Sequence, residues 1–246
     1  MGILDLFGGG KVLYYPGCLT KNELKEQFAN YKEILEKLEI NFILLSKEEN
    51  CCGLPEIESG RKKEAKKLAK KNFDLFKENN VRKIIAGSPE CYHMFKNIYP
   101  KLVHEWNIEV EYISVSILDA LKKKRIKFKG RDEEKEIVSY HDSSYLGRWC
   151  SIYDEPREVI GLLGGRIIEM KLNRENSLSC GAGGGVYKNY PEISKGAAKI
   201  VSSKVPKEAV KLICVSPLCY INLSSVNDKS IEFSSFVLRK FKEMEI

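Results

Sequence analysis

The cysteines of this chain are grouped in a way that suits metal or redox chemistry. Cys18, the adjacent pair Cys51-Cys52, and Cys91 fall in the first half of the sequence. Neighbouring cysteines rarely form a disulfide with each other, but both can reach one metal centre. The chain has eight cysteines and no recognisable export signal, which argues against a disulfide framework. We therefore expect thiolate ligands or redox groups at these positions.

The same pattern recurs in the second half with most of its thiols replaced. It contains Ser144, then Ser179-Cys180-Gly181, then Ser216-Pro-Leu-Cys219, and the last of these matches the first-half turn Ser88-Pro-Glu-Cys91. The offset is 126 residues at the first position and 128 at the others. So constant an offset predicts an internal duplication in which one copy has kept its sulfur chemistry.

The elements expected to position these residues alternate between strands and helices. The predicted segments are strands at 11–15, 41–45, 81–86, 136–140, 166–170 and 210–215, with helices at 23–38 and 61–79 in the first half. Each cysteine-bearing turn follows a strand. Such alternation predicts an α/β fold with parallel sheets, here two tandem Rossmann-like βαβ halves. The charged, turn-prone stretch around Gly130 divides them into residues 1–129 and 130–246.

Composition excludes several classes of function. The chain has 246 residues, of which 43% are hydrophobic and 30% charged, as in folded globular proteins. No apolar run approaches the ~20 residues of a membrane span, and no signal peptide is recognisable. We expect a cytoplasmic protein, with any membrane association made through a partner. The net charge of +7 is mild, and its lysine tracts lack interleaved aromatic residues, so nucleic-acid binding is not expected.

These motifs resemble the cysteine-rich CCG domain family. The resemblance runs from about residue 11 to 240 and includes Tyr15-Pro-Gly-Cys18, Cys51-Cys52-Gly53, Tyr140-His-Asp and Gly181-Ala-Gly-Gly-Gly185. That family includes the B and D subunits of heterodisulfide reductase and iron–sulfur subunits of lactate, glycolate and anaerobic glycerol-3-phosphate oxidation systems. It implies five thiolates per copy, with noncubane [4Fe–4S] clusters in the heterodisulfide reductase branch. This chain departs from the pattern at four of the ten positions, which hold Ser88, Ser144, Ser179 and Ser216.

The serines decide which copy could hold a cluster. A hydroxyl ionises far less readily than a thiol of pKa ~8.5 and is a harder ligand, whereas four thiolates suffice for a [4Fe–4S] cluster. We expect one such cluster, cubane or noncubane, on the four first-half thiols Cys18, Cys51, Cys52 and Cys91. The second copy is expected to be degenerate and to hold no cluster unaided; its positions are Ser144, Ser179, Cys180, Ser216 and Cys219. The four serines are either natural or introduced into a parent with two five-thiol sites.

Other residues compete for a role in the second copy. Cys150 and Cys214 could join Cys180 and Cys219 in a four-thiol site, although Cys214 also fits the core of an apolar strand. The His141-Asp142 pair matches the family's sequence and is expected to orient its loop rather than act as an acid–base pair. His93 and His104 are expected in surface or packing positions.

The resemblance implies an iron–sulfur redox subunit of a multi-subunit oxidoreductase. The first-half centre would transfer electrons or act on a disulfide or thiol. The chain has no ferredoxin-type C-x2-C-x2-C-x3-C-P run and no flavin fingerprint, so partner subunits of the ferredoxin type or bearing flavin would supply those parts. The alternative is a folded relative without a cluster, which binds a partner and has no redox activity.

Overall fold

The computed structural model describes residues 9–45 and 51–246, which fold into two compact units. The first unit comprises Met1–Cys18 and Asn41–Ile113, and the second comprises Leu19–Ile40 and Ser114–Ile246. No described helix is long and apolar enough to cross a bilayer.

The first unit is built on a parallel sheet of three strands. These are β1 (Lys11–Tyr15), β2 (Val81–Ala86) and β3 (Glu109–Tyr112), in the order β1-β2-β3. β1 and β2 have the bounds expected from the sequence. The strand expected at 41–45 is reduced to a single parallel bridge between Ile43 and Leu13, because the segment exchanges only two backbone hydrogen bonds with β1.

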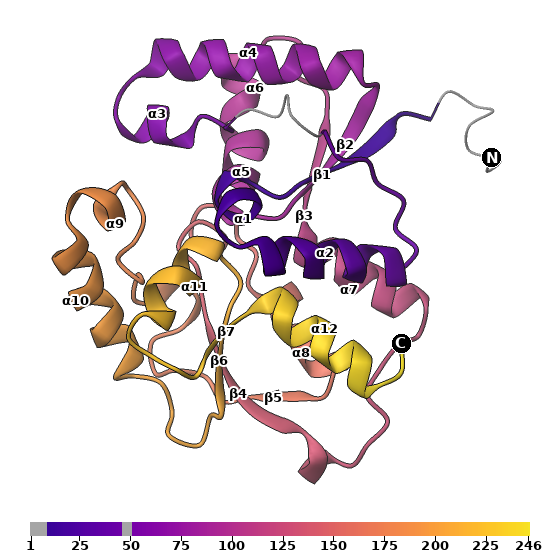
Figure 1. The fold of residues 1–246 in the computed structure, drawn as a ribbon, viewed down its shortest axis with the longest axis vertical. Helices are drawn as coiled ribbons and strands as arrows, with labels where there is room; N and C mark the ends of the chain where they lie inside the picture. The colour runs from indigo at the N-terminus through magenta and orange to yellow at the C-terminus, as the bar shows by residue number, and fades with distance from the viewer. Residues whose placement is uncertain (1–8, 46–50) are drawn as a thin grey trace. The chain divides into compact units, whose positions relative to one another are not determined.

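Short helices and one long helix complete the first unit (Figure 1). The short elements are α3 (Leu54–Glu58), α5 (Pro89–His93), the π-helical turn Met94–Ile98 and α6 (Tyr99–Leu102). The long helix α4 (Lys62–Glu78) buries alanine and phenylalanine and leaves most of its lysines in water. Phe76 on this helix joins an aromatic cluster with Tyr15, Phe95, Tyr99 and Trp106.

The second unit has a parallel sheet of four strands. These are β4 (Glu136–His141), β5 (Gly165–Ile167), β6 (Lys211–Cys214) and β7 (Ser230–Glu232), in the order β5-β4-β6-β7. The first sheet has the same order if the Ile43 bridge is placed where β5 stands. The α/β class with parallel sheets is therefore confirmed.

The second unit also takes helices from the first half of the sequence. Its helices are α2 (Lys25–Lys37), α7 (Ile113–Lys123), α8 (Asp154–Leu162), α9 (Val186–Asn189), α10 (Pro191–Ser202), α11 (Pro217–Ser224) and α12 (Phe233–Glu243). The first residue of α7, Ile113, is counted with the first unit. Helix α1 (Cys18–Asn22) begins at the junction of the units. α2 lies beside α12 (Figure 1), and the amide of Asn30 donates to the hydroxyl of Ser235 over 3.2 Å. The boundaries of the compact units therefore differ from the predicted boundary at residue 130. That boundary remains a prediction for where one copy of the duplicated sequence ends and the other begins.

Candidate functional site

Two parallel strands bring the first-unit cysteines to one edge of the sheet. β1 ends at Tyr15, and a Pro16-Gly17 turn leads to Cys18 at the start of α1. β2 ends at Ala86, and Cys91 follows on α5. Because neighbouring parallel strands end at the same edge, the two cysteines approach the same region. Gly17 has a φ of 83°, in the left-handed region that favours glycine.

The four first-half thiols are linked by contacts between their side chains. Cys51 hydrogen-bonds to Cys18 and to Cys52, and Cys52 also hydrogen-bonds to Cys91. Cys18 is exposed and Cys51 is half-buried, whereas Cys52 and Cys91 are buried. The group therefore runs from the surface of the first unit into its interior.

Backbone contacts fix the loop that carries the adjacent pair. Gly53, at a φ of 88°, donates its N–H to Cys51 Sγ over 3.5 Å. Asn72 of α4 donates its amide to the Cys51 carbonyl oxygen over 3.0 Å, and Tyr99 donates its hydroxyl to the Cys52 carbonyl oxygen over 3.0 Å. Asn72 also donates to the Tyr99 hydroxyl over 2.9 Å. Both cysteine carbonyls are thus held by buried side chains.

The electrostatics of this group favour a bound cationic centre. Hydrogen bonds from Cys18 and Cys52 lower the pKa of Cys51 to about 3. The pKa of Cys52 is raised well above its ordinary value by its hydrogen bonds to Cys51 and Cys91 and by burial. One thiolate is therefore stabilised at the expense of its neighbour, because adjacent like charges repel in a dry interior. Cys51 and Cys52 can both be thiolates here only around positive charge, which fits an iron–sulfur centre.

Ser88 does not extend this group of thiols. It precedes α5, and its hydroxyl donates to the Glu90 carboxylate over 2.6 Å. A hydroxyl engaged in this way leaves the first unit with a set of four sulfur donors, which is the number that a [4Fe–4S] cluster needs.

The second unit brings together Cys180, Cys219 and a residue that was not expected to be a ligand, His141. Their ligand atoms all lie within 4.8 Å of one another, and all three side chains are buried. The two sulfur atoms are 2.9 Å apart. Hydrogen bonding to Cys219 outweighs burial and, with the nearby imidazole, holds the pKa of Cys180 well below its ordinary value.

The serines of the second copy make local hydrogen bonds. The hydroxyl of Ser144 accepts from the Arg148 guanidinium, and that of Ser179 accepts from Gly181 N–H over 3.2 Å. Ser216 caps α11 by accepting from Cys219 N–H over 3.4 Å. These hydroxyls shape the loops.

The loop-orienting role expected for the His141-Asp142 pair falls to Asp142. Asp142 is the residue that orients the loop, because its carboxylate oxygens accept from the two terminal nitrogens of Arg157 over 2.7 and 2.8 Å, and one of them also accepts from Arg174 N–H over 2.8 Å. His141 ends β4 beside Cys214 of β6, and its imidazole lies by the cysteine pair. Its position at a strand's carboxyl end was the signal in the sequence that could have identified it.

The remaining candidates lie outside these two groups. Cys214 is fully buried, with its sulfur 3.9 Å from the Leu212 carbonyl oxygen, and the buried trio includes neither Cys214 nor Cys150. His93 is buried within reach of Asn97, and His104 is exposed. All eight cysteines are described, and none forms a disulfide.

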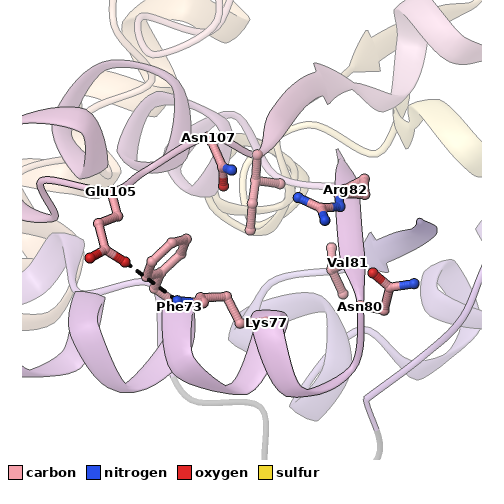
Figure 2. A pocket seen from close by; sticks show the side chains of 8 residues that line it. Phe73, Lys77, Asn80, Val81, Arg82, Glu105 and Asn107 are labelled. Carbon is pink, nitrogen blue, oxygen red and sulfur yellow. Dashed lines mark hydrogen bonds and ion pairs between the residues drawn. The ribbon is translucent and has the colours of Figure 1, made fainter. Parts of the chain in front are cut away.

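A surface pocket of the first unit lies away from the thiols (Figure 2). Its lining includes Val81 and Arg82, at the amino end of β2, whereas the thiols gather beyond the carboxyl end. Lys77 and Glu105 form an ion pair of 3.4 Å at its edge. Both partners are exposed, so this pocket offers no enclosed site.

Comparisons with known proteins agree with the motifs. The chain is 32% identical over 227 residues to the D subunit of the dihydromethanophenazine:CoB--CoM heterodisulfide reductase of Methanosarcina mazei, which covers 88% of this chain and 54% of that protein. It is 33% identical over 177 residues to the "Probable iron-sulfur-binding oxidoreductase FadF" of Bacillus subtilis, covering 71% of this chain and 24% of that protein. It is 32% identical over 178 residues to the "EtfAB:quinone oxidoreductase" of Syntrophomonas wolfei, covering 70% and 24%.

The chain thus spans about half the length of the first of these relatives and a quarter of the other two. The profile of the CCG cysteine-rich domain matches it twice, at residues 12–96 and 138–224. These two matches cover most of the sequence. The chain therefore belongs to the CCG cysteine-rich domain family.

Proposed function

We propose that this chain is an iron–sulfur redox subunit of a multi-subunit oxidoreductase. Its [4Fe–4S] cluster would be held by the four first-unit thiolates Cys18, Cys51, Cys52 and Cys91. The observation that carries the proposal is the continuous set of thiol contacts beyond the carboxyl ends of β1 and β2. Family membership and the name of the iron–sulfur-binding relative from Bacillus subtilis support it.

The residues around the thiols suit this role. A bound cluster of this kind supplies one-electron transfer, with a potential set by hydrogen bonds and solvent exposure. Asn72 and Tyr99 hold the Cys51-Cys52 loop in place, and Tyr99 also packs against Phe95 in the aromatic cluster. Cys18 lies at the exposed edge, where an electron-transfer partner could approach.

The two halves are inferred to have arisen by duplication. The same order of parallel strands in both units supports this inference, as do the two CCG matches and the constant offset of the Ser-Pro-x-Cys turns. The first copy would retain the redox centre. The second would have lost it by replacing thiols with serines.

Partner subunits follow from the same proposal. Two relatives are named as a heterodisulfide reductase subunit and an EtfAB:quinone oxidoreductase. By analogy, a ferredoxin-type or flavin-bearing subunit would exchange electrons with this chain, and such a partner could hold it at a membrane. A disulfide or thiol could be the substrate at the cluster, as in heterodisulfide reduction.

Anaerobic reconstitution followed by a reductive titration tests the redox role. The reconstituted chain should show a reversible one-electron change in its EPR spectrum and visible absorption. A chain that folds, stays colourless and takes up no iron would refute the proposal and leave the partner-binding scaffold as the function.

A further inference from the structure

The second unit contains a small buried site that the proposed redox role does not use. We propose that His141, Cys180 and Cys219 bind a single thiophilic divalent cation of the zinc class. The site would hold a single metal ion at the cysteine positions of the second copy, in place of a cluster. One of its ligands, His141, lies outside the cysteine motif. The proposal does not depend on whether the first unit holds iron and sulfide.

The donor set does not fit an iron–sulfur cluster. Only two motif thiols remain in this copy, and the three serines at the other positions make local hydrogen bonds. The donor atoms are also tightly grouped, all within 4.8 Å of one another. Two thiolates that bind one Zn²⁺ at ~2.3 Å with a tetrahedral angle lie ~3.8 Å apart, so the Cys180 and Cys219 sulfurs, 2.9 Å apart here, would separate by about 0.9 Å around a bound ion.

His141 supplies independent evidence for a ligand. Its side chain is 1% exposed and interacts with the Cys180 thiol, but neither ring nitrogen makes a hydrogen bond of good geometry. Buried polar groups are satisfied in the great majority of cases, and an exception calls for an unseen water or ion. Imidazole is the commonest protein ligand for metals, and a cation held with Cys180 and Cys219 would satisfy one ring nitrogen.

Each ligand is held by contacts with its surroundings. His141 is fixed by the pairing of β4 with β6, and Asp142 beside it is anchored by Arg157. The Cys180 carbonyl accepts from the Asn222 amide over 2.7 Å, much as the Cys51 carbonyl accepts from Asn72. Cys219 lies in the first turn of α11, which Ser216 caps. The site is therefore built into the second unit.

The chemistry of the trio selects the class of ion. Two thiolates and one imidazole suit zinc, whereas magnesium and calcium prefer oxygen ligands. Three protein ligands leave a tetrahedral ion one further position, which would be taken by water or a small ligand.

A disulfide between Cys180 and Cys219 is the competing outcome. The sulfur separation of 2.9 Å exceeds the ~2.05 Å of a disulfide, so the thiols would have to move closer. A disulfide would also leave both His141 nitrogens buried without partners. A bound cation accounts for all three side chains at once.

Cobalt titration of the reduced full-length chain tests the site. The titration is made in a Cys51→Ser/Cys52→Ser background, so that the first-unit thiols do not compete for metal. We expect one equivalent of Co²⁺ to bind with the sulfur-to-cobalt charge-transfer and tetrahedral d–d bands of a thiolate site, and Zn²⁺ to displace it. Adding His141→Asn should weaken binding by more than about 100-fold, beyond the loss usual for an outer-shell partner.

The controls separate a lost ligand from a lost fold. Cys214→Ser changes a buried thiol and Cys150→Ser a half-buried one, both outside the trio, and each should keep the bound cobalt. Circular dichroism shows whether each variant is folded. If the background itself does not fold, zinc content and the same bands are measured on the cluster-loaded wild-type chain and its His141→Asn variant. A folded chain that binds no cobalt, keeps its affinity with His141→Asn, or forms the Cys180–Cys219 disulfide in place of binding would overturn the proposal.

Discussion

At the first site, the turn between β1 and Cys18 requires a glycine at position 17. Its φ of 83° lies in a region that side-chain-bearing residues rarely adopt. A Cβ added here would lie 3.1 Å from Ser88 Cβ and 3.2 Å from Cys91 Sγ. The turn therefore needs glycine both for its backbone conformation and for the close approach of Cys91.

Gly17→Ala should consequently lower both stability and iron uptake. The strained conformation alone is expected to cost about 1–3 kcal/mol of unfolding free energy, measured by denaturant titration. Gly161→Ala is the matched control, because a Cβ at that position in α8 meets no atom within 4 Å. It should be neutral or stabilising by up to ~1 kcal/mol. Equal effects of the two changes would contradict this account of the turn.

At the second site, Arg157 stabilises the loop that follows His141 by pairing with Asp142. Its side chain is 9% exposed, Asp142 is 3% exposed, and the guanidinium also contacts Glu169. Arg157→Ala would leave the Asp142 carboxylate buried without its cation, at an expected cost of about 3–5 kcal/mol in unfolding free energy. Glu105→Gln, in the exposed pair with Lys77, should cost no more than about 1 kcal/mol. Thermal and denaturant unfolding of both variants would show whether the difference exists.

At the scale of elements, helix α2 is joined to the second unit through a buried carboxylate. Tyr31 of α2 donates its hydroxyl to Glu232 at the end of β7 over 2.7 Å. Ser234 donates its N–H to the same carboxylate over 2.7 Å. Burial nevertheless raises the pKa of Glu232 to about 7, because these hydrogen bonds only partly offset the loss of water.

This raised pKa predicts a pH dependence of stability. Between pH ~4.5 and 7 the folded state holds a proton on Glu232 that the unfolded state has lost, so stability should fall as the pH rises. The loss should approach about 3 kcal/mol above pH 7. The difference in unfolding free energy between Glu232→Gln and wild type, followed from pH 5 to 8, isolates this contribution. A difference that stays constant over this range would rule out Glu232 as its source.

Local pattern predicted most of the elements but not their assignment to units. Short segments rich in apolar residues predicted β1 and β2 with their observed bounds, and α2 and α4 differ from expectation by one or two residues at their ends. Residues 41–45 have strand composition, yet they pair with β1 only at Ile43. Helix α2 belongs to the second unit because of long-range contacts, such as the hydrogen bond between Tyr31 and Glu232. A local sequence pattern does not contain such contacts, so it could not predict the unit to which α2 belongs.

At the scale of the whole molecule, the chain combines two units with the same strand order and different donor sets. The first unit gathers four thiols, and the second gathers two thiols and an imidazole. The cysteine positions could be predicted from spacing, because each turn follows a strand. The spacing of the cysteine motifs did not identify His141 as a ligand, because His141 lies outside those motifs; only its place at the end of a strand pointed to it.

The iron and acid-labile sulfide content of the anaerobically reconstituted chain tests the central claim most directly. Wild type and Cys214→Ser should each contain about four iron and four sulfide per chain, as one [4Fe–4S] cluster requires. Cys52→Ser should lose most of both while remaining folded. Cys214 is the matched control because both thiols are buried and only Cys52 contacts the first-unit group. An iron-free wild type, or a Cys52→Ser variant with undiminished iron and sulfide, would contradict the account.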